Sequence, residues 1–409
     1  MIPRDYWEHR WSDLFVALFA DWQRESGDTV VELSGVGGCV PAQSGRAALV
    51  AALRALGLPR EARVGVPLFC CPVVFQAIRS AGCRPVFVDV DPESFCLCPQ
   101  DLAAKVYHLD AVLAVHMFGN LCDVPAIRRL SGQRPIIEDC AQALGSRLGT
   151  QPAGHMGTVA FFSFRSGKYL SAGWGGALFT KDTALRARLR EVIGSQPRPS
   201  RVAAARHTLA QFLKSVLRSR PAYGWFGYRL WETAGARELR GDCTAIRPDP
   251  IFPGDLTVAR RRVRGLEAAI QTQRAYADYL ENSLTVDRTM LRQERAGTFA
   301  NRYLFPVRLA SSAERDRLAD RLRAKGVDTM RYLDDVVGVA RERYGYAGDC
   351  PESERLSRTV LVLPTYHALR VKDLRRIVAA TNELWEEIRR SRCAEKLDAG
   401  SRVASANAS

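Results

Sequence analysis

The stretch that decides the fold is "FFSFRSGKYLSAGWGGALFT", which runs from Phe161 to Thr180. Its two apolar ends predict buried strands, and a glycine-rich turn and one lysine, Lys168, lie between them. The chain has 59 basic residues, and only seven of them are lysines. Arginine stays protonated in proteins and cannot replace lysine as an amine nucleophile. Lys168 is therefore either a reactive amine or a solvated surface charge, and its spacing alone leaves both interpretations open.

Strands and helices alternate around this stretch, from about residue 44 to residue 180. Segments such as "SGRAALVAALRALG" and "PVVFQAIRSAG" predict helices. Short runs rich in Val, Ile and Phe predict buried strands: "RVGVPLF", "RPVFVDV", "DAVLAVHMF", "RPIIEDC", "TVAFFSF" and "GALFT". The alternation favours an α/β fold with a mostly parallel central sheet and helices on both faces.

The C-terminal part predicts a smaller α+β domain. "RYLFPVRL", "VDTMRY" and "RTVLVLP" are strand-like, and helical patterns lie near 313–325 and 373–390. We expect a large domain over residues 1–262 and a small domain over residues 263–393. Residues 394–409 are small and polar, which predicts a disordered tail.

Residues 192–250 interrupt the alternation with five prolines, and no acidic residue lies between Val192 and Trp231. Apolar side chains recur at helical spacing on one stripe: Leu209, Phe212, Leu213, Val216 and Leu217. Such a helix either packs its stripe on the core or, with the basic and aromatic residues beside it, lies on a membrane surface. The second alternative predicts a peripheral membrane contact through residues 208–231.

The composition argues against a nucleic-acid-binding protein, a disulfide-rich protein and a membrane-spanning protein. The net charge is +15, but no nucleic-acid-binding motif accompanies it, so anionic small molecules are the expected partners. The eleven cysteines contain no C-x-x-C pair, so we expect neither a metal site nor a disulfide framework. There is no run of about 18 apolar residues, and the first thirty residues lack the order of a secretory signal. These features predict a cytoplasmic protein without a transmembrane helix.

Polar residues gather where predicted strands end and helices begin. Ser44 and Gly45 open a helix, which suits either a phosphate or an ordinary N-cap. Asp139 ends one strand and Ser163 ends another, five residues before Lys168. Ligands of open α/β sheets bind beyond the carboxyl ends of the strands, so these side chains are placed for a common site.

Together these features resemble the fold type I pyridoxal-phosphate (PLP) enzymes, and more narrowly the DegT/DnrJ/EryC1/StrS aminotransferases, which act mainly on nucleotide-linked keto-sugars. The motifs that carry the resemblance are "EDCAQALG", "FSFRSGKYLSAGWGG", "VPLFCCPVVFQAIRSAGCRPVFVDVD" and "VHMFGNLCDVPAI". "KGVDTMRY" and "VLVLPTY" resemble the family's small domain. The likeness is good over residues 41–182 and fainter over 300–390.

The resemblance implies a role for each matching residue. Lys168 would form the Schiff base with PLP and then shuttle the proton. Asp139 would pair with the pyridinium nitrogen, and Gln142 would hydrogen-bond the phenolic oxygen. The phosphate would be held by Ser44, Gly45, Arg46 and Ser163. Phe69 or Cys70 lies where members place a residue that stacks on the ring, and Phe69 is chemically better suited.

The sequence also departs from the family pattern. Arg46 replaces a frequent threonine, Leu144 a frequent histidine, and Trp174 a frequent acidic residue. The family's "GxNxRM" segment, which sends an asparagine to the partner's phosphate, has no convincing match. Arg260, Arg261 and Arg262 are candidates to replace this contact by position and charge.

The resemblance predicts a homodimeric PLP-dependent aminotransferase that moves an amino group from an amino acid donor, glutamate, to a keto-sugar nucleotide. Two alternatives remain. The same chemistry could act on a lipid-linked or natural-product ketone, or the chain could be a non-catalytic PLP-binding regulatory protein.

Overall fold

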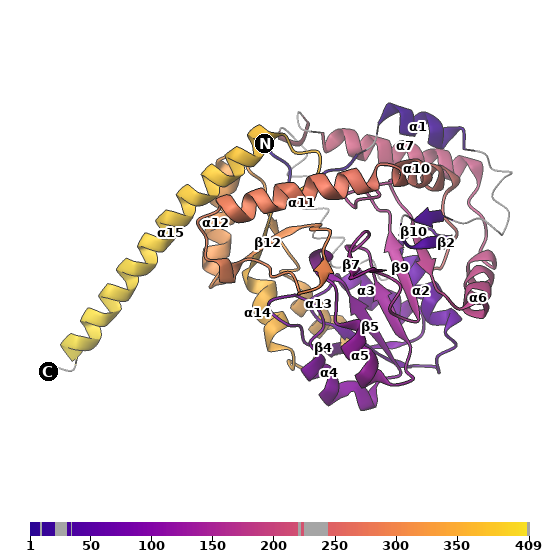
Figure 1. The fold of residues 1–409 in the computed structure, drawn as a ribbon, viewed down its shortest axis with the longest axis horizontal. Helices are drawn as coiled ribbons and strands as arrows, with labels where there is room; N and C mark the ends of the chain where they lie inside the picture. Colours follow the sequence, from indigo (N-terminus) through magenta and orange to yellow (C-terminus); the bar gives the residue numbers. More distant parts are fainter. Residues whose placement is uncertain (9, 21–30, 34, 220–221, 225–243, 407–409) are drawn as a thin grey trace.

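The computed structural model describes residues 1–8, 10–20, 31–33, 35–219, 222–224 and 244–406 (Figure 1). Part of the segment 208–231, including most of its aromatic cluster, lies outside these residues. Within the described part of the chain, no helix is both long and apolar enough to cross a membrane.

A central sheet has the strand order β1-β2-β10-β9-β6-β5-β3-β4. The strands from β9 to β4 are parallel neighbours, and β10, β2 and β1 continue the sheet in antiparallel fashion. The bounds are β1 (Val31–Leu33), β2 (Gly37–Ala42), β3 (Arg63–Pro67), β4 (Arg84–Val88), β5 (Ala111–Val115), β6 (Ile136–Asp139), β9 (Val159–Ser163) and β10 (Gly176–Phe179). All six predicted strand runs of this region are confirmed.

Side chains of β9 show how the sheet separates two cores, because successive side chains of a strand point to opposite faces. Phe161 packs into a core that includes side chains of the predicted helices α2 and α3. Phe162 packs on the other face, with side chains of α1, α10 and α11. The predicted mostly parallel sheet with helices on both faces is confirmed.

The helices around the large sheet begin with recognisable signals. Ser44 caps α2 by accepting a hydrogen bond from the Ala47 N–H, and Pro72 opens α3. The bounds are α1 (Trp11–Leu18), α2 (Gly45–Ala55), α3 (Pro72–Ser80), α4 (Pro99–Lys105), α5 (Val124–Ser131), α6 (Thr183–Gly194), α7 (Arg201–Leu217), α10 (Pro253–Val263) and α11 (Leu266–Ser283). Short 3₁₀ turns occupy η1 (Val106–His108), η2 (Met117–Gly119) and η4 (Arg288–Met290).

The C-terminal part builds a second sheet, β12-β14-β13, and its three predicted strands are confirmed. A third small sheet has the order β11-β7-β8. The bounds are β7 (Arg147–Leu148), β8 (Gln151–Pro152), β11 (Thr298–Phe299), β12 (Phe305–Arg308), β13 (Met330–Arg331), β14 (Val360–Leu363), α12 (Ser312–Ala324), α13 (Val336–Tyr344), α14 (Pro351–Thr359) and α15 (Val371–Ala406). Helix α15 therefore continues through most of the segment for which the sequence predicts disorder.

The core of this second part gathers side chains from residues 277–388, and Ile2 joins them. The Ile2 N–H donates to the Gly326 carbonyl, and the Asp328 N–H donates to the Ile2 carbonyl. The N-terminus is thus tied to the C-terminal part of the fold. The division into domains at residue 262 stays a prediction.

Candidate active site

The residues predicted for chemistry meet at one edge of the large sheet. Asp139 ends β6 and Ser163 ends β9, and these two strands are parallel neighbours. Gly176, at the start of β10, pairs with Ser163 on one side and with Ala42 on the other. The end of β2 therefore brings the start of α2 to the same edge, as the sequence predicts.

Lys168 lies in the turn between β9 and β10, and hydrogen bonds of the turn fix its backbone. Its own N–H donates to the Arg165 carbonyl over 3.0 Å. Its Nζ lies 4.6 Å from the centroid of the Tyr303 ring. Burial and the nearby charge of Arg165 lower the pKa of Lys168 to about 8, although Asp139 acts in the opposite direction. A large fraction of this amine is neutral near pH 8, which is the form that can act as a nucleophile or base.

Two adjacent carboxylates, Glu138 and Asp139, have pKa values that their surroundings shift in opposite directions. Burial alone would raise the pKa of Glu138, but hydrogen bonds from His116 and from the Gly154 and Gly157 N–H groups hold it below its usual range. Burial raises the pKa of Asp139, and the Ala141 N–H and the charge of Lys168 offset this only in part. No basic side chain of the described residues forms an ion pair with Asp139. Glu138 is thus satisfied within the fold, whereas Asp139 still lacks a cationic partner.

His116, Glu138 and Cys140 also lie close enough together to resemble a metal site. The His116 Nδ1 accepts from the Cys122 N–H, so its Nε2 carries the proton and donates to Glu138 over 3.0 Å. The Glu138 oxygens accept three backbone N–H groups as well. These contacts account for the cluster as structural support beneath Asp139.

The start of α2 packs closely against β9 and β10. A Cβ atom built on Gly45 would lie 3.0 Å from the Ser163 Cβ, and one built on Gly176 would lie 2.7 Å from the Gly45 N. A side chain at Gly176 would therefore displace backbone atoms, and one at Gly45 would press on Ser163. The close approach leaves the first N–H groups of α2 beside the Ser163 hydroxyl, an arrangement that suits a phosphate.

Two of the departures from the family pattern contact each other. The guanidinium carbon of Arg46 lies 5.1 Å from the centroid of the Trp174 ring. Burial raises the pKa of Asp255 to about 6, and this carboxyl accepts from the backbone N–H of Trp174 and from His207. Arg46 is thus placed beside the glycine turn, and the turn is linked to α10 and α7.

Gln142 is held at both ends of its side chain. Its Oε1 accepts from the Phe118 N–H over 3.1 Å, and its Nε2 donates to the Tyr332 hydroxyl over 2.9 Å. Phe69 is fully buried in an aromatic cluster with Phe95, Phe118 and Tyr332. Cys70 is also fully buried, whereas Cys71 is partly exposed and near enough to Lys168 to act on it electrostatically. The role predicted for Phe69, which is to stack on the cofactor ring, stays a prediction.

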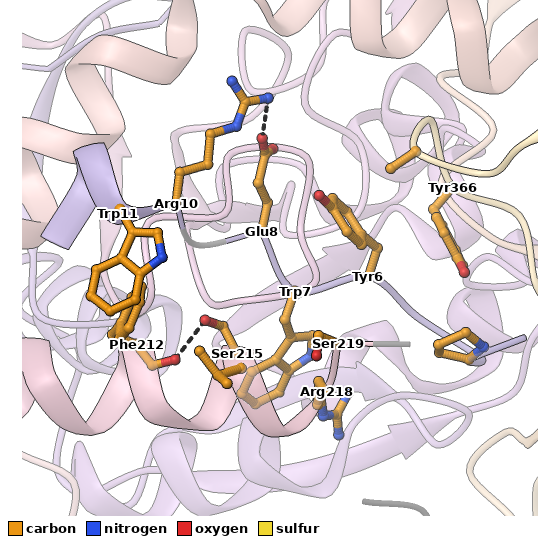
Figure 2. A pocket seen from close by; sticks show the side chains of 13 residues that line it. Tyr6, Trp7, Glu8, Arg10, Trp11, Phe212, Ser215, Arg218, Ser219 and Tyr366 are labelled. Atoms are coloured by element: carbon orange, nitrogen blue, oxygen red, sulfur yellow. Dashed lines mark hydrogen bonds and ion pairs between the residues drawn. The ribbon is translucent and has the colours of Figure 1, made fainter. Parts of the chain in front are cut away.

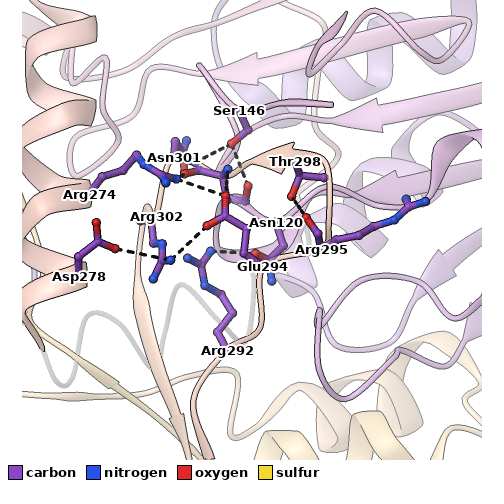
Figure 3. Close-up of polar contacts among 12 residues, drawn as sticks. Asn120, Ser146, Arg274, Asp278, Arg292, Glu294, Arg295, Thr298, Asn301 and Arg302 are labelled. Carbon is purple, nitrogen blue, oxygen red and sulfur yellow. Dashed lines mark hydrogen bonds and ion pairs between the residues drawn. The ribbon is translucent and has the colours of Figure 1, made fainter. Parts of the chain in front are cut away.

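Sequence reasoning missed a supporting loop that arrives from residues 292–303. Asn301 donates to the Gln142 and Leu144 carbonyls, 2.9 Å each, and so fixes the turn that follows Asp139. Figure 3 shows Asn301 beside Ser146, with Arg274, Arg292 and Arg302 around Glu294. Two residues after Asn301, the ring of Tyr303 faces Lys168 Nζ, and its hydroxyl donates to the Gly167 carbonyl. Asn301 and Tyr303 lie more than 130 positions after Lys168 in the sequence, so no spacing rule could connect them with it.

The N-terminal segment also reaches this site. Arg4, Asp5 and Tyr6 line the pocket at Lys168 together with residues of the C-terminal part, Thr365, Tyr366 and His367. Arg262 donates to the Glu8 carbonyl and to Asp13, so it secures this segment within its own chain. Arg260 and Arg261 are exposed on α10 and remain candidates for a contact with a second subunit.

The sequence matches the profile of the DegT/DnrJ/EryC1/StrS aminotransferase family over residues 25–208 and 257–382. The chain belongs to this family. The matched residues include every residue that the sequence predicts for the site, from Ser44 to Lys168.

Relatives and solved structures agree with this membership. An L-glutamine:2-deoxy-scyllo-inosose aminotransferase of Streptomyces lividus is 35% identical over 190 residues, which are 44% of this chain and 45% of that protein. The chain therefore matches less than half the length of that relative. A UDP-N-acetyl-3-dehydro-alpha-D-glucosamine 3-aminotransferase of Acidithiobacillus ferrooxidans is 28% identical over 85% of this chain and 84% of its own. The fold is similar to that of the aminotransferase TlmJ from Streptoalloteichus hindustanus, with a TM-score of 0.71 at 23% identity over 95% of this chain and 100% of the other.

Proposed function

We propose that the chain is a PLP-dependent aminotransferase that moves the amino group of L-glutamate onto a keto-sugar nucleotide, with Lys168 as the amine that binds the cofactor. The observation that carries the proposal is the presence at one sheet edge of Lys168, whose pKa is lowered to about 8, and of Asp139, a buried carboxyl that forms no ion pair with the described residues. A reactive amine and an unmatched anion are what PLP requires at its two ends.

The residues present fit the cofactor. Asp139 would pair with the ring nitrogen, because a cation there would relieve the cost of its burial. The start of α2 and Ser163 would hold the phosphate, and Gln142 would bond the phenolic oxygen. When bound, PLP supplies an electron sink for the carbon that exchanges its amino group.

The chain's own groups then move the proton. Lys168 Nζ would take a proton from the donor's carbon and later deliver one to the acceptor carbon that receives the amino group, because its pKa near 8 lets it hold either state at neutral pH. The Tyr303 ring face would keep the amine in position in both states. Asn301 supports Gln142, and the Ala141 N–H supports Asp139. These contacts would keep the side chains of Gln142 and Asp139 in place.

The choice of a nucleotide-linked acceptor is supported by the relative that acts on a UDP-linked sugar and aligns over most of the chain. The excess of basic residues fits a diphosphate. A keto-cyclitol is the second candidate acceptor, favoured by the 35% identity to the 2-deoxy-scyllo-inosose enzyme.

We test the reaction by incubating the PLP-loaded protein with ¹⁵N-labelled L-glutamate and a panel of UDP- and TDP-linked keto-sugars, with 2-deoxy-scyllo-inosose in parallel. The expected result is a labelled amino-sugar nucleotide, detected by mass spectrometry and absent with Lys168→Ala. L-glutamine is run as an alternative donor. Label found only in the cyclitol would replace the proposed acceptor, and label in neither would refute the assignment.

The chain is expected to work as a homodimer, as the resemblance implies. Arg260 and Arg261, exposed on α10, would face the phosphate of the second subunit. Sedimentation at several protein concentrations measures the mass, and Arg260→Ala with Arg261→Ala should weaken PLP binding if this contact forms.

A further inference from the structure

Two helices, α1 and α7, present apolar side chains to solvent along adjacent stripes, and we call their exposed surface the α1/α7 face. They lie side by side over α10 (Figure 1), and the Trp11 and Phe212 rings are 4.5 Å apart. The stripe of α1 consists of Trp11, Phe15 and Leu18, and Phe19 follows it; the stripe of α7 consists of Val202, Leu209, Leu213, Val216 and Leu217. Phe15 is 57% exposed and Leu213 58%. These residues account for most of the large apolar side chains exposed on the described part of the chain.

Helix α7 buries polar side chains and exposes aliphatic ones, which is the reverse of an ordinary surface helix. Its buried side includes Thr208, Gln211 and Ser215, and of the predicted apolar stripe only Phe212 is buried. The structure therefore contradicts the ordinary interpretation, in which the stripe packs on the core. An exposed aliphatic stripe opposite buried polar groups indicates a contact that the described residues do not supply.

The family profile matches residues 25–208 and 257–382, so all of α1 and the part of α7 from Leu209 onward lie outside the matched residues.

The charge of the α1/α7 face indicates what kind of surface it contacts. Arg201, Arg206 and Lys214 are exposed on α7, between the exposed aliphatic positions. No acidic residue occurs between Val192 and Trp231, and the acidic Asp13 of α1 is buried against Arg262. A second copy docked about a two-fold axis would place this cationic surface against itself. A basic helix that carries aromatic and aliphatic side chains on one exposed side has the character of a helix at an anionic lipid surface.

The face adjoins the catalytic pocket. A cavity of about 530 Å³ lies beneath it, between the N-terminal segment and α7. Figure 2 shows Trp7, Trp11 and Phe212 on its walls, and Tyr6 and Tyr366 at its other side. The pocket at Lys168 is lined by the same Tyr6 and Tyr366. A surface that meets the α1/α7 face therefore lies next to the entrance of the site.

We propose that the α1/α7 face docks this protein on an anionic lipid surface. The apolar stripes enter the headgroup region, and the three cations of α7 contact the negative headgroups. Each exposed cation contributes about fivefold to partition onto such a surface. The docking does not depend on which ketone the site uses, and it adds a membrane location to the proposed transamination.

The test is co-sedimentation of the full chain with vesicles of phosphatidylcholine alone and of phosphatidylcholine with phosphatidylglycerol. The expected result is binding to the anionic vesicles that weakens as salt rises from about 0.1 M to about 1 M. Phe15→Glu combined with Leu213→Glu should lower the partition by about tenfold or more. Val371→Glu is the matched control, since Val371 is 57% exposed and begins α15, which is not part of the face.

Transamination of a water-soluble acceptor by the double variant verifies its fold, and its mass is measured in parallel. Unaltered binding by the double variant would overturn the proposal, and so would absence of binding by the wild type. If the double variant instead turns a dimer into a monomer while the wild type ignores vesicles, a second copy covers the face and the proposal is wrong.

Discussion

Helices α2 and α7 use aliphatic side chains in opposite ways. In α2, residues Ala47 to Leu53 are all buried, and the helix start points its N–H groups at the catalytic edge. In α7, Leu209 and Leu213 face solvent while Thr208 and Gln211 are buried. The difference teaches that hydrophobic periodicity identifies a helix but not what covers its apolar side. Helix α2 uses its aliphatic side chains inside the fold, whereas α7 leaves most of its own at the surface.

The largest expected effect lies at the site that α2 supports. Lys168→Ala should lower transamination by at least about 10³-fold, because both cofactor attachment and the proton shuttle need the amine. Lys181→Ala is the control, since Lys181 only donates to the His155 carbonyl at the surface. The measurement is amino transfer from L-glutamate under saturating PLP. Equal turnover in the two variants would remove Lys168 from the mechanism.

The adjacent carboxylates provide the next comparison. Asp139→Asn should lower kcat by about 10²-fold and leave the melting temperature nearly unchanged, since burial disfavours the charge of Asp139 in the absence of a cation. Glu138→Gln should cost about 3 kcal/mol or more of the free energy of unfolding, because it breaks a buried pair with His116. Kinetics and denaturant unfolding of both variants check this. A loss of stability in Asp139→Asn together with a loss of kcat alone in Glu138→Gln would contradict the roles assigned to the two carboxylates.

The packing of the two helices can be compared directly. Leu49→Ala in α2 should cost about 2–5 kcal/mol, because it opens a cavity in the core. Leu213→Ala in α7 should change the free energy of unfolding by less than about 0.5 kcal/mol, since its side chain is mostly exposed. Urea unfolding in the absence of lipid gives both values. A similar cost at Leu213 would show that the face is already covered in solution.

The smallest effect is a shift along the pH axis. Lys168 in cofactor-free protein should react with PLP faster as pH rises and reach half of its maximum near pH 8. Because its folded pKa lies below its unfolded value, the free energy of unfolding should also rise between about pH 8 and pH 10. Arg165→Gln removes a charge that lowers this pKa, so the midpoint should move to higher pH. Borohydride trapping followed by peptide mass spectrometry checks the site, and an unmoved midpoint would contradict the role of Arg165.

The sequence predicts the parts of this molecule that depend on local pattern. The strands that end at Asp139 and Ser163 and the turn that carries Lys168 follow from short motifs, and the parallel pairing of β6 and β9 brings them together. Asn301 and Tyr303 could not be predicted, because long-range folding rather than spacing places them at the site. Phe69 lies at a strand end, and the sequence does not show that its side chain packs into a buried aromatic cluster. The orientation of α7 escaped prediction because an apolar stripe has the same pattern whether it faces the core or solvent.

The central claim is that Lys168 and Asp139 form a working PLP site, and an absorbance spectrum tests it most directly. The purified protein is saturated with PLP, and spectra are recorded before and after addition of L-glutamate, with L-glutamine in a repeat. The account predicts a visible cofactor band that is absent in Lys168→Ala and that the donor bleaches, as the amino group passes to the cofactor. A cofactor band that neither donor alters, or the absence of any band, would contradict it.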